Sequence, residues 1–166
     1  KINGIEETDL ILLIGTNPRF EATMLNARIR KAYLKNKLKI VSLNDVGDLT
    51  YPYQSLDGKT KTIKDIIENN HEMTKDTTVS KKPMIIFGES FLKSNSAEYL
   101  FRSFKKFLLD KEKFNDDWNP LNIISTDAAT VGNLDLDIID QNNEVLKDLN
   151  ENKFELIFLL GQDNLK

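Results

Sequence analysis

The chain has 166 residues, of which 40% are hydrophobic and 30% charged, and both values are ordinary for one globular domain. The net charge of −3 gives no reason to expect nucleic-acid binding. The absence of cysteine excludes disulfides, thiolate zinc sites and iron–sulfur ligation within these residues. No apolar stretch approaches the roughly 20 residues that cross a bilayer, so we expect no direct membrane insertion.

The first predicted element is a strand over Leu10–Ile14, which runs into the polar turn Gly15–Asn17. A helix over about Glu21–Asn36 and a second strand over Lys39–Leu43 follow it, separated by a short polar turn of the length usual in α/β units. Continuous aliphatic runs without polar alternation are typical of strands buried on both faces, as in a parallel sheet covered by helices.

The next stretch is irregular, and we expect Tyr51 and Tyr53 to pin it to the surface. A short amphipathic helix is predicted near residues 63–67, where isoleucines recur at helical spacing. The segment Thr74–Lys82 is rich in threonine and lysine, and we predict a mobile polar linker there, ending at Pro83.

A third aliphatic strand is predicted over Met84–Phe87, and it also runs into a glycine turn, Gly88–Ser90. A helix is predicted from the N-cap residue Ser96 through Asp110, with a phenylalanine-rich stripe that packs on the sheet. The segment around Trp118 is a polar loop.

The last predicted elements are a strand over Leu121–Ile124, a helix over about Asn142–Leu149 and a strand over Leu156–Leu160 that runs into Gly161–Asp163. Strands that alternate with helices in this way indicate an α/β fold. We predict a doubly wound, mostly parallel sheet with helices on both faces.

Three strands therefore end in a glycine followed by polar residues, at Gly15, Gly88 and Gly161. The carboxyl ends of parallel strands share one edge of a sheet, and ligands bind in the crevice there, so we expect these turns to gather along that edge. Neither the G-x-G-x-x-G nor the G-x-x-x-x-G-K-[ST] pattern surrounds Gly15, and a tight strand-to-helix turn alone also favours glycine. Two interpretations of these turns are therefore possible: they line a crevice that faces a phosphate group, or their glycines serve only the turn geometry.

The sequence offers no convincing catalytic set. The only histidine, His71, is expected to be a solvated loop residue. Asp135, Asp137 and Asp140 alternate with apolar residues and read as a solvated face. We therefore assign no catalytic residue and no metal site.

Arginine is rare in this lysine-rich chain, and three of its four arginines are Arg19, Arg28 and Arg30. The planar guanidinium forms paired contacts that lysine does not reproduce. Arg28 and Arg30 fall on opposite flanks of the apolar stripe of their helix, so we expect them to hold that helix to its neighbours.

The block Ile5–Ala22, continued by Leu25–Lys31, closely resembles the large iron–sulfur subunits of respiratory complex I, the NADH-quinone oxidoreductases, in their C-terminal molybdopterin-oxidoreductase-like domain. Later blocks of the same resemblance follow in the expected order: Asp48–Tyr51, Lys82–Met84, Trp118 with Asn122 and Ile123, Val131–Leu136, and Phe158–Gly161.

The resemblance implies that residues 1–166 form one Rossmann-like, molybdopterin-oxidoreductase-type domain, a fragment of a longer chain whose N-terminal iron–sulfur part is absent. The parent subunit would carry 2Fe-2S and 4Fe-4S clusters that pass electrons from NADH towards quinone. Its partners would be the other peripheral-arm subunits. It would lie at the cytoplasmic side of a bacterial membrane or the matrix side of the mitochondrial inner membrane.

The resemblance also implies that the turns with Gly15, Thr16, Asn17, Gly161 and Asp163 match positions that face the phosphates of a pterin dinucleotide in molybdopterin enzymes. The leading hypothesis is a scaffold and assembly domain in which this crevice is vestigial and no cofactor binds. The alternative is the dinucleotide-binding domain of an active, formate dehydrogenase-like molybdopterin oxidoreductase. A free-standing nucleotide-binding module is disfavoured because the glycine-rich signatures are missing.

Under the scaffold hypothesis, Arg19, Arg28 and Arg30 have a structural role. They would form ion pairs that hold the first turn and helix, with Glu21 or with a partner.

Overall fold

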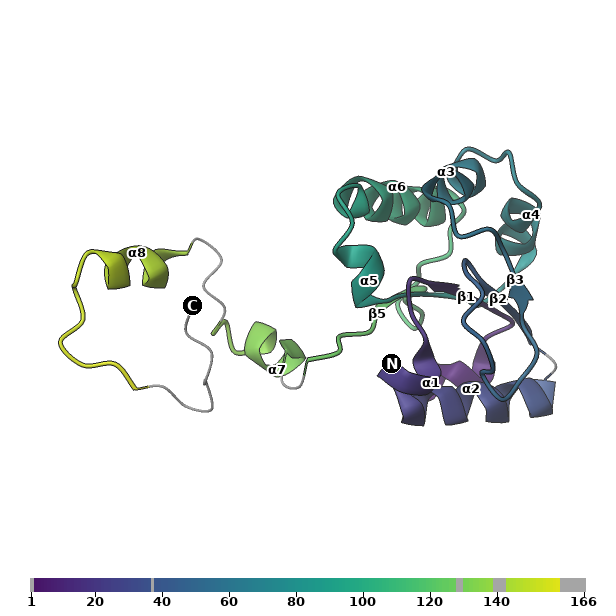
Figure 1. The fold of residues 1–166 in the computed structure, drawn as a ribbon. Helices are drawn as coiled ribbons and strands as arrows, with labels where there is room; N and C mark the ends of the chain where they lie inside the picture. Colours follow the sequence, from purple (N-terminus) through teal and green to yellow (C-terminus); the bar gives the residue numbers. More distant parts are fainter. Residues whose placement is uncertain (1, 37, 128–129, 139–142, 159–166) are drawn as a thin grey trace. The chain divides into compact units, whose positions relative to one another are not determined.

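The computed structural model describes residues 2–36, 38–127, 130–138 and 143–158 (Figure 1). The chain divides into two compact units, Lys1–Thr126 and Asp127–Lys166. None of the helices in the described ranges has both the length and the hydropathy needed to cross a membrane.

The first unit is built on a five-stranded sheet in which every neighbouring pair is parallel. The central strand is the aliphatic run predicted first, and Leu12 pairs with Val41 on one side and with Ile85 on the other. In spatial order the strands are β3 (Gln54–Ser55), β2 (Lys39–Ser42), β1 (Leu10–Ile14), β4 (Pro83–Phe87) and β5 (Leu121–Ile123).

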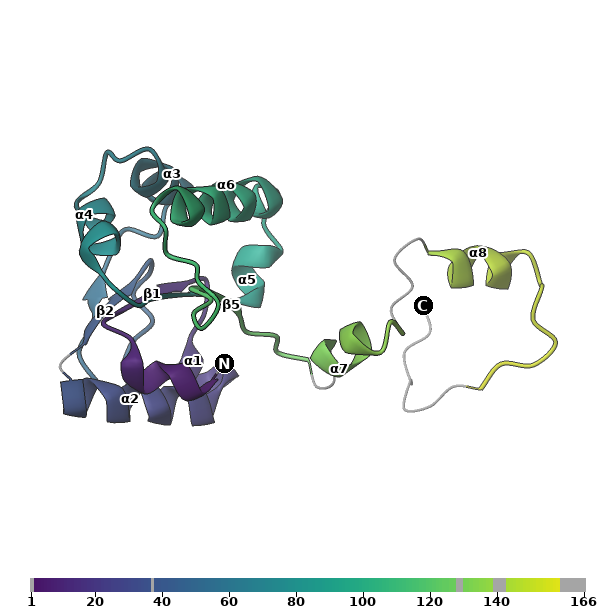
Figure 2. The same cartoon turned by 180° about the vertical axis from the view of Figure 1, so that it is seen from behind.

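Helices cover both faces of this sheet, which confirms the predicted α/β architecture (Figures 1 and 2). One face carries the 3-10 helix η1 (Ile2–Glu7), α1 (Pro18–Glu21) and α2 (Thr23–Asn36). The other face carries α3 (Thr60–Ile67), α4 (Glu72–Val79), α5 (Glu89–Leu92) and α6 (Ala97–Asp110).

The central strand β1 supplies side chains to the core on both faces of the sheet. Leu12 and Ile14 pack in one core with Phe87 and the phenylalanines of α6. Ile11 and Leu13 pack in the other core, against α2. All five residues of β1 are buried, as the unbroken aliphatic run predicts for a strand covered on both faces.

The predicted mobile linker over Thr74–Lys82 is wrong, because most of it belongs to helix α4. Met73 is 1% exposed, and Thr74 and Thr77 are also buried. The Thr74 hydroxyl donates to the Ile66 carbonyl at 2.8 Å and the Thr77 hydroxyl to the Met73 carbonyl at 2.8 Å. A buried hydroxyl that is hydrogen-bonded in this way costs little, so a polar-looking sequence packs in the core.

Two other details differ from the prediction. The helix predicted over about Glu21–Asn36 begins at Thr23 as α2, and a separate short helix, α1, precedes it, because the backbone of Ala22 leaves the helical region with a φ of −150°. His71 is half-buried and caps α4, where its Nδ1 accepts the amide of Met73 at 3.1 Å.

The second unit contains two short helices, α7 (Thr130–Asp135) and α8 (Glu144–Asn150). The helix predicted over Asn142–Leu149 corresponds to α8. The strand predicted over Leu156–Leu160 is wrong for residues 156–158, which form no strand and have exposed side chains. An apolar run becomes a strand only when its backbone pairs with a neighbour. The rest of that prediction, with Gly161–Asp163, lies outside the described residues.

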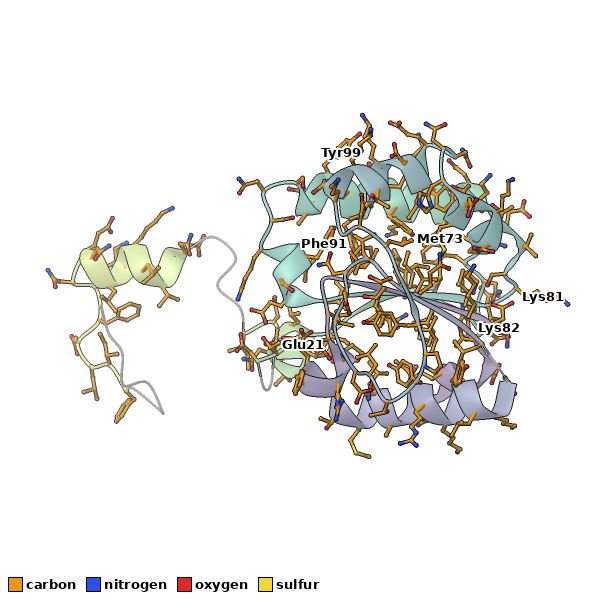
Figure 3. All side chains as sticks on the ribbon, turned by 45° about the vertical axis from the view of Figure 1, so that its right-hand side comes forward. Glu21, Met73, Lys81, Lys82, Phe91 and Tyr99 are labelled. Atoms are coloured by element: carbon orange, nitrogen blue, oxygen red, sulfur yellow. The ribbon has the colours of Figure 1, made fainter. Side chains whose placement is uncertain are left out.

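Asp9 anchors the segment that enters β4, at the amino end of the central strands. Its carboxylate accepts the amides of Lys81 at 2.7 Å and Lys82 at 3.1 Å, and also the hydroxyl of Ser80. Burial of the carboxyl raises its pKa, but these hydrogen bonds lower it more, so the net pKa lies below the usual 3.8. Lys81 and Lys82 lie across the domain from Glu21 (Figure 3).

We expect Asp9→Asn to lower the free energy of unfolding at pH 7 by roughly 1 kcal/mol, because one acceptor and the charge are lost at a partly exposed site. A depressed pKa means that the unfolded chain binds more protons, so this stability is present above pH ~4 and is lost as the pH falls through the folded-state pKa. Urea titrations at pH 7 and pH 3 measure it. A wild-type-to-variant difference that is the same at both pH values would contradict the expectation. Asp116→Asn, in an exposed loop, is the control.

Candidate functional site

Two of the three predicted glycine turns meet at the carboxyl edge of the sheet. Gly15 follows β1 and Gly88 follows the adjacent strand β4, and the amide of Gly88 donates to the carbonyl of Ile14 at 2.9 Å. The Ser90 hydroxyl donates to the carbonyl of Gly15. The first two turns therefore gather as predicted, whereas Gly161 and Asp163 lie outside the described residues.

The two turns are packed so closely that each requires glycine. Gly15 has a φ of +63°, and a Cβ there would lie 2.6 Å from the Cβ of Phe91. A Cβ on Gly88 would lie 2.1 Å from the carbonyl oxygen of Gly15. Phe91 points inward from α5 toward the sheet (Figure 3).

A small crevice of about 180 Å³ opens beside these turns, at the position predicted for a ligand. It contains two carboxylates, those of Glu21 and Asp45, and no described lining residue is basic. The lining residues are Gly15, Thr16, Asn17, Glu21, Ser42, Asn44, Asp45, Val46 and Ser90.

The carboxylate of Glu21 closes the first turn from within the chain. Its Oε1 accepts the backbone amide of Asn17 at 3.0 Å, and its Oε2 accepts the hydroxyl of Thr16 at 2.6 Å. A backbone amide and a hydroxyl at a strand-to-helix turn are the donors that a phosphate oxygen would use. Here both donors are satisfied by a side chain one helical turn further along.

Asn17 joins this turn to the loop on the other side of the crevice. Its Oδ1 accepts the amide of Arg19 at 3.1 Å, which caps α1, and its Nδ2 donates to the carbonyl of Val46 at 2.9 Å. The loop is held in turn by Tyr53, whose hydroxyl donates to Asp45 at 2.6 Å. This hydrogen bond, followed by that from the Gly47 amide, lowers the pKa of Asp45, so that the carboxyl is ionised at neutral pH.

Tyr51 also holds this loop, as the sequence predicts. Its ring is buried, and its hydroxyl donates to Oδ1 of Asn26 at 2.7 Å. Asn26 uses its Nδ2 to donate to the carbonyl of Leu49 at 3.0 Å, so that α2 and the loop share a buried polar network. Burial raises the pKa of Tyr51 well above the usual value, which keeps the hydroxyl a donor.

The three arginines do not converge on the crevice. Arg19 pairs with Asp48 at 2.6 Å and also donates to the Asp48 carbonyl at 2.6 Å, whereas Arg28 pairs with Glu6 at 2.6 Å. Arg30 is exposed, and its charge makes a small contribution to the lowered pKa of Asp48, after the Thr50 amide and Arg19. Glu21 binds none of them. Their structural role stays a prediction.

The described residues contain no group of three or more histidine, aspartate and glutamate side chains placed to hold a metal ion. Within the crevice, Glu21 and Asp45 both act as acceptors of hydrogen bonds from their own neighbours. The arrangement orders a turn and a loop, and it presents neither a nucleophile beside a base nor a cluster of cations.

The roles of Glu21 and Ser90 were not predicted from the sequence. A signal for the first was present, because Asn17 precedes a helix that begins with proline, and a glutamate follows within its first turn. That pattern is close to a capping box, in which a glutamate side chain returns to the amide of the N-cap residue. No comparable pattern marks Ser90, whose contact with Gly15 depends on the pairing of β1 with β4.

A parallel α/β domain with glycine turns around a crevice at its carboxyl edge belongs to the broad class of doubly wound domains. Within that class, the sequence model of the family described as "Molybdopterin oxidoreductase" matches residues 1–166, and the chain belongs to this family.

The relatives place the chain more narrowly and confirm the resemblance to the large complex I subunit. It is 37% identical over 164 residues to the NADH-ubiquinone oxidoreductase 75 kDa subunit of Reclinomonas americana, covering 98% of this chain and 24% of the relative. It is 35% identical over 162 residues to a subunit of the NADH-quinone oxidoreductase of Rickettsia conorii, covering 98% of this chain and 23% of the relative.

A third relative is the mitochondrial NADH dehydrogenase [ubiquinone] iron-sulfur protein 1 of Solanum tuberosum, which is 28% identical over 164 residues, covering 99% of this chain and 22% of the relative. The chain therefore spans about a quarter of the length of the curated relatives that it matches.

Proposed function

We propose that this chain is part of the peripheral arm of an NADH-quinone oxidoreductase, and that the portion seen here is a non-catalytic scaffold and assembly domain. The parent subunit would carry 2Fe-2S and 4Fe-4S clusters on cysteines outside these residues. The names of the relatives support this assignment, since they are subunits of NADH dehydrogenases and one is an iron-sulfur protein. The complex would lie at the cytoplasmic side of a bacterial membrane or at the matrix side of the mitochondrial inner membrane.

The observation that carries the scaffold role is the carboxylate of Glu21 in the first glycine turn. A pterin dinucleotide presents phosphates to such turns, and its negative charge favours amide donors and cations. In the described part of the crevice, Glu21 already occupies the donors of Thr16 and Asn17, and Asp45 adds a second negative charge. These residues do not fit a bound phosphate group.

The alternative is an active formate dehydrogenase-like molybdopterin oxidoreductase. Metal analysis and pterin fluorescence of the purified full-length protein distinguish it from the scaffold. We expect iron in the amounts of several clusters, and neither molybdenum, tungsten nor pterin fluorescence after denaturation. Stoichiometric molybdenum or tungsten with a pterin would overturn the scaffold role.

Glu21→Ala tests the closed turn directly. It leaves the amide of Asn17 and the hydroxyl of Thr16 without their acceptor, so we expect a loss of about 1 kcal/mol or more in local stability at the turn. Hydrogen exchange followed by mass spectrometry of peptides covering residues 15–22 of the full-length protein should show faster exchange in the variant.

Added inorganic phosphate should leave exchange in the wild type unchanged. If phosphate slowed exchange of the wild-type turn, the turn would still accept an anion, and the proposed closure by Glu21 would be wrong. Glu98→Ala is the matched control, because Glu98 lies in the first turn of α6, where its exposed carboxylate pairs with Arg102.

A further inference from the structure

The outward face of α2 carries large apolar side chains in solvent. Met24, Ala27, Lys31 and Leu34 follow the spacing of one helical face, opposite the buried residues Asn26, Ile29 and Ala32. Met24 is 78% exposed and Leu34 is 70% exposed. In α1, just before this helix, Phe20 is 79% exposed. Met24 lies in the first turn of α2 and Leu34 near its end, and exposed large apolar side chains that recur along one face of an outer helix mark a contact surface more often than isolated ones do.

The charges of the same helix are all positive. Arg28, Arg30, Lys31 and Lys35 lie on α2, which contains no acidic residue, although the whole chain has a net charge of −3. Arg28 and Lys31 are held by Glu6, at 2.6 Å and 3.7 Å. Arg30 and Lys35 are exposed, and among the described residues no ion pair engages them.

We infer that the outward face of α2, comprising Met24, Ala27, Arg30, Lys31, Leu34 and Lys35, docks on a neighbouring subunit whose surface presents carboxylates around an apolar strip. The inference rests on the proposed function, because it requires an assembly. Interfaces combine apolar contacts with complementary charge at the rim. Met24, Ala27 and Leu34 run along the outward line of α2 with Lys31 among them, and around the helix axis Arg30 lies on one flank of this line and Lys35 on the other.

Other occupants fit the charges less well. A second copy of the chain, packed on the same face about a twofold axis, would bring the cations of α2 against one another. An anionic membrane is held by clusters of about four to eight basic residues, whereas among the described residues only Arg30 and Lys35 on this face are without an ion pair. α2 is also packed on the sheet through its inner face, as Figure 2 shows, which leaves only its outer face for a partner.

Lysine acylation with mass-spectrometric readout tests the inference on the full-length subunit, free and in the assembled complex. We expect Lys31 and Lys35 to react readily in the free subunit and at least several-fold more slowly in the complex. The double variant Arg30→Glu with Lys35→Glu should reduce incorporation into the complex about tenfold or more, with a deficit that deepens as salt is lowered. Lys105→Glu, on the exposed side of α6, is the matched control.

Three outcomes would overturn the inference. Equal reactivity of Lys31 and Lys35 in the two states would show that nothing docks there. Protection already present in the free full-length subunit would show that another part of the same chain covers α2. Binding of the free subunit to phosphatidylserine vesicles, abolished by the charge reversal, would assign the face to a membrane. If the subunit enters no complex at all, the proposed function fails together with the inference, whereas assembly with reactive lysines refutes the inference alone.

Discussion

Gly88→Ala should destabilise the first unit by more than about 3 kcal/mol, because overpacking against fixed backbone is among the most damaging single changes. The added Cβ would lie 2.1 Å from the carbonyl oxygen of Gly15 and 2.6 Å from the Cβ of Thr16. Relief of this clash requires β1 and β4 to separate at their carboxyl ends, where the Gly88 amide bonds to Ile14. Equilibrium denaturation followed by circular dichroism measures the loss.

Two other glycines provide matched controls for this substitution. Gly132 lies in α7, and a Cβ added there would have nothing within 4 Å, so Gly132→Ala should be neutral or slightly stabilising. Gly47 has a φ of +73° and equally open surroundings, so Gly47→Ala should cost about 1 kcal/mol from backbone strain alone. If Gly88→Ala cost no more than Gly47→Ala, the close approach of the two turns would be refuted.

Phe104→Ala should lower the free energy of unfolding by about 3–5 kcal/mol, the usual cost of truncating a fully buried phenylalanine. Phe104 is 0% exposed and makes edge-on ring contacts with Phe87, at a centroid distance of 6.0 Å, and with Phe107, at 5.7 Å. The cavity would therefore open between α6 and the sheet. Chemical denaturation of the variant measures the change.

Tyr99→Ala is the control on the same helix. Tyr99 is exposed and points away from the core at the outer side of α6 (Figure 3), so its truncation should change stability by no more than about 0.5 kcal/mol. Equal losses for Phe104→Ala and Tyr99→Ala would mean that α6 is not docked through its phenylalanine face.

The sheet could be predicted because its strands are encoded locally. The run Leu10–Ile14 is β1 to the residue, and β2, β4 and β5 each fall within one residue of their predicted ends. β1 and β4 are buried at every residue and apolar at every residue, which is the pattern expected for a strand covered on both faces. The two-residue strand β3 has exposed side chains and no such pattern, and it was not predicted.

Helix α4 could not be predicted in this way, because its burial depends on distant partners. Thr74 is satisfied by the carbonyl of Ile66 in α3, and Met73 reaches the core between the helices and the sheet, as its inward position in Figure 3 shows. The threonines of this segment led to the prediction of an exposed linker, but a threonine hydroxyl that donates to a backbone carbonyl can be buried in a core. Only the tertiary arrangement supplies those acceptors.

Of the predicted site, the meeting of the turns at Gly15 and Gly88 was confirmed, whereas the hydrogen-bond partners around them were not predicted. Gly15 and Gly88 each follow a predicted strand, and because β1 and β4 are parallel neighbours, their two turns meet at the carboxyl edge of the sheet. The arginines were expected to pair with Glu21 or with a partner, and among the described residues Arg19 binds Asp48 and Arg28 binds Glu6. Ion-pair partners depend on which side chains share a surface, and the sequence order of charges does not specify that.

The central position of β1 has a consequence for synthesis on the ribosome. Ile85 in β4 is synthesised well after its partner Leu12, and at about 5–20 residues per second the nascent chain holds this aliphatic strand unpaired on one side for roughly 4 to 15 seconds. A nascent chain that stops before Pro83 leaves the backbone amides and carbonyls of β1 unpaired on the side where β4 would bind, and such an edge is prone to aggregation. We therefore expect biogenesis of this protein to benefit from a chaperone that shields β1 until β4 has emerged.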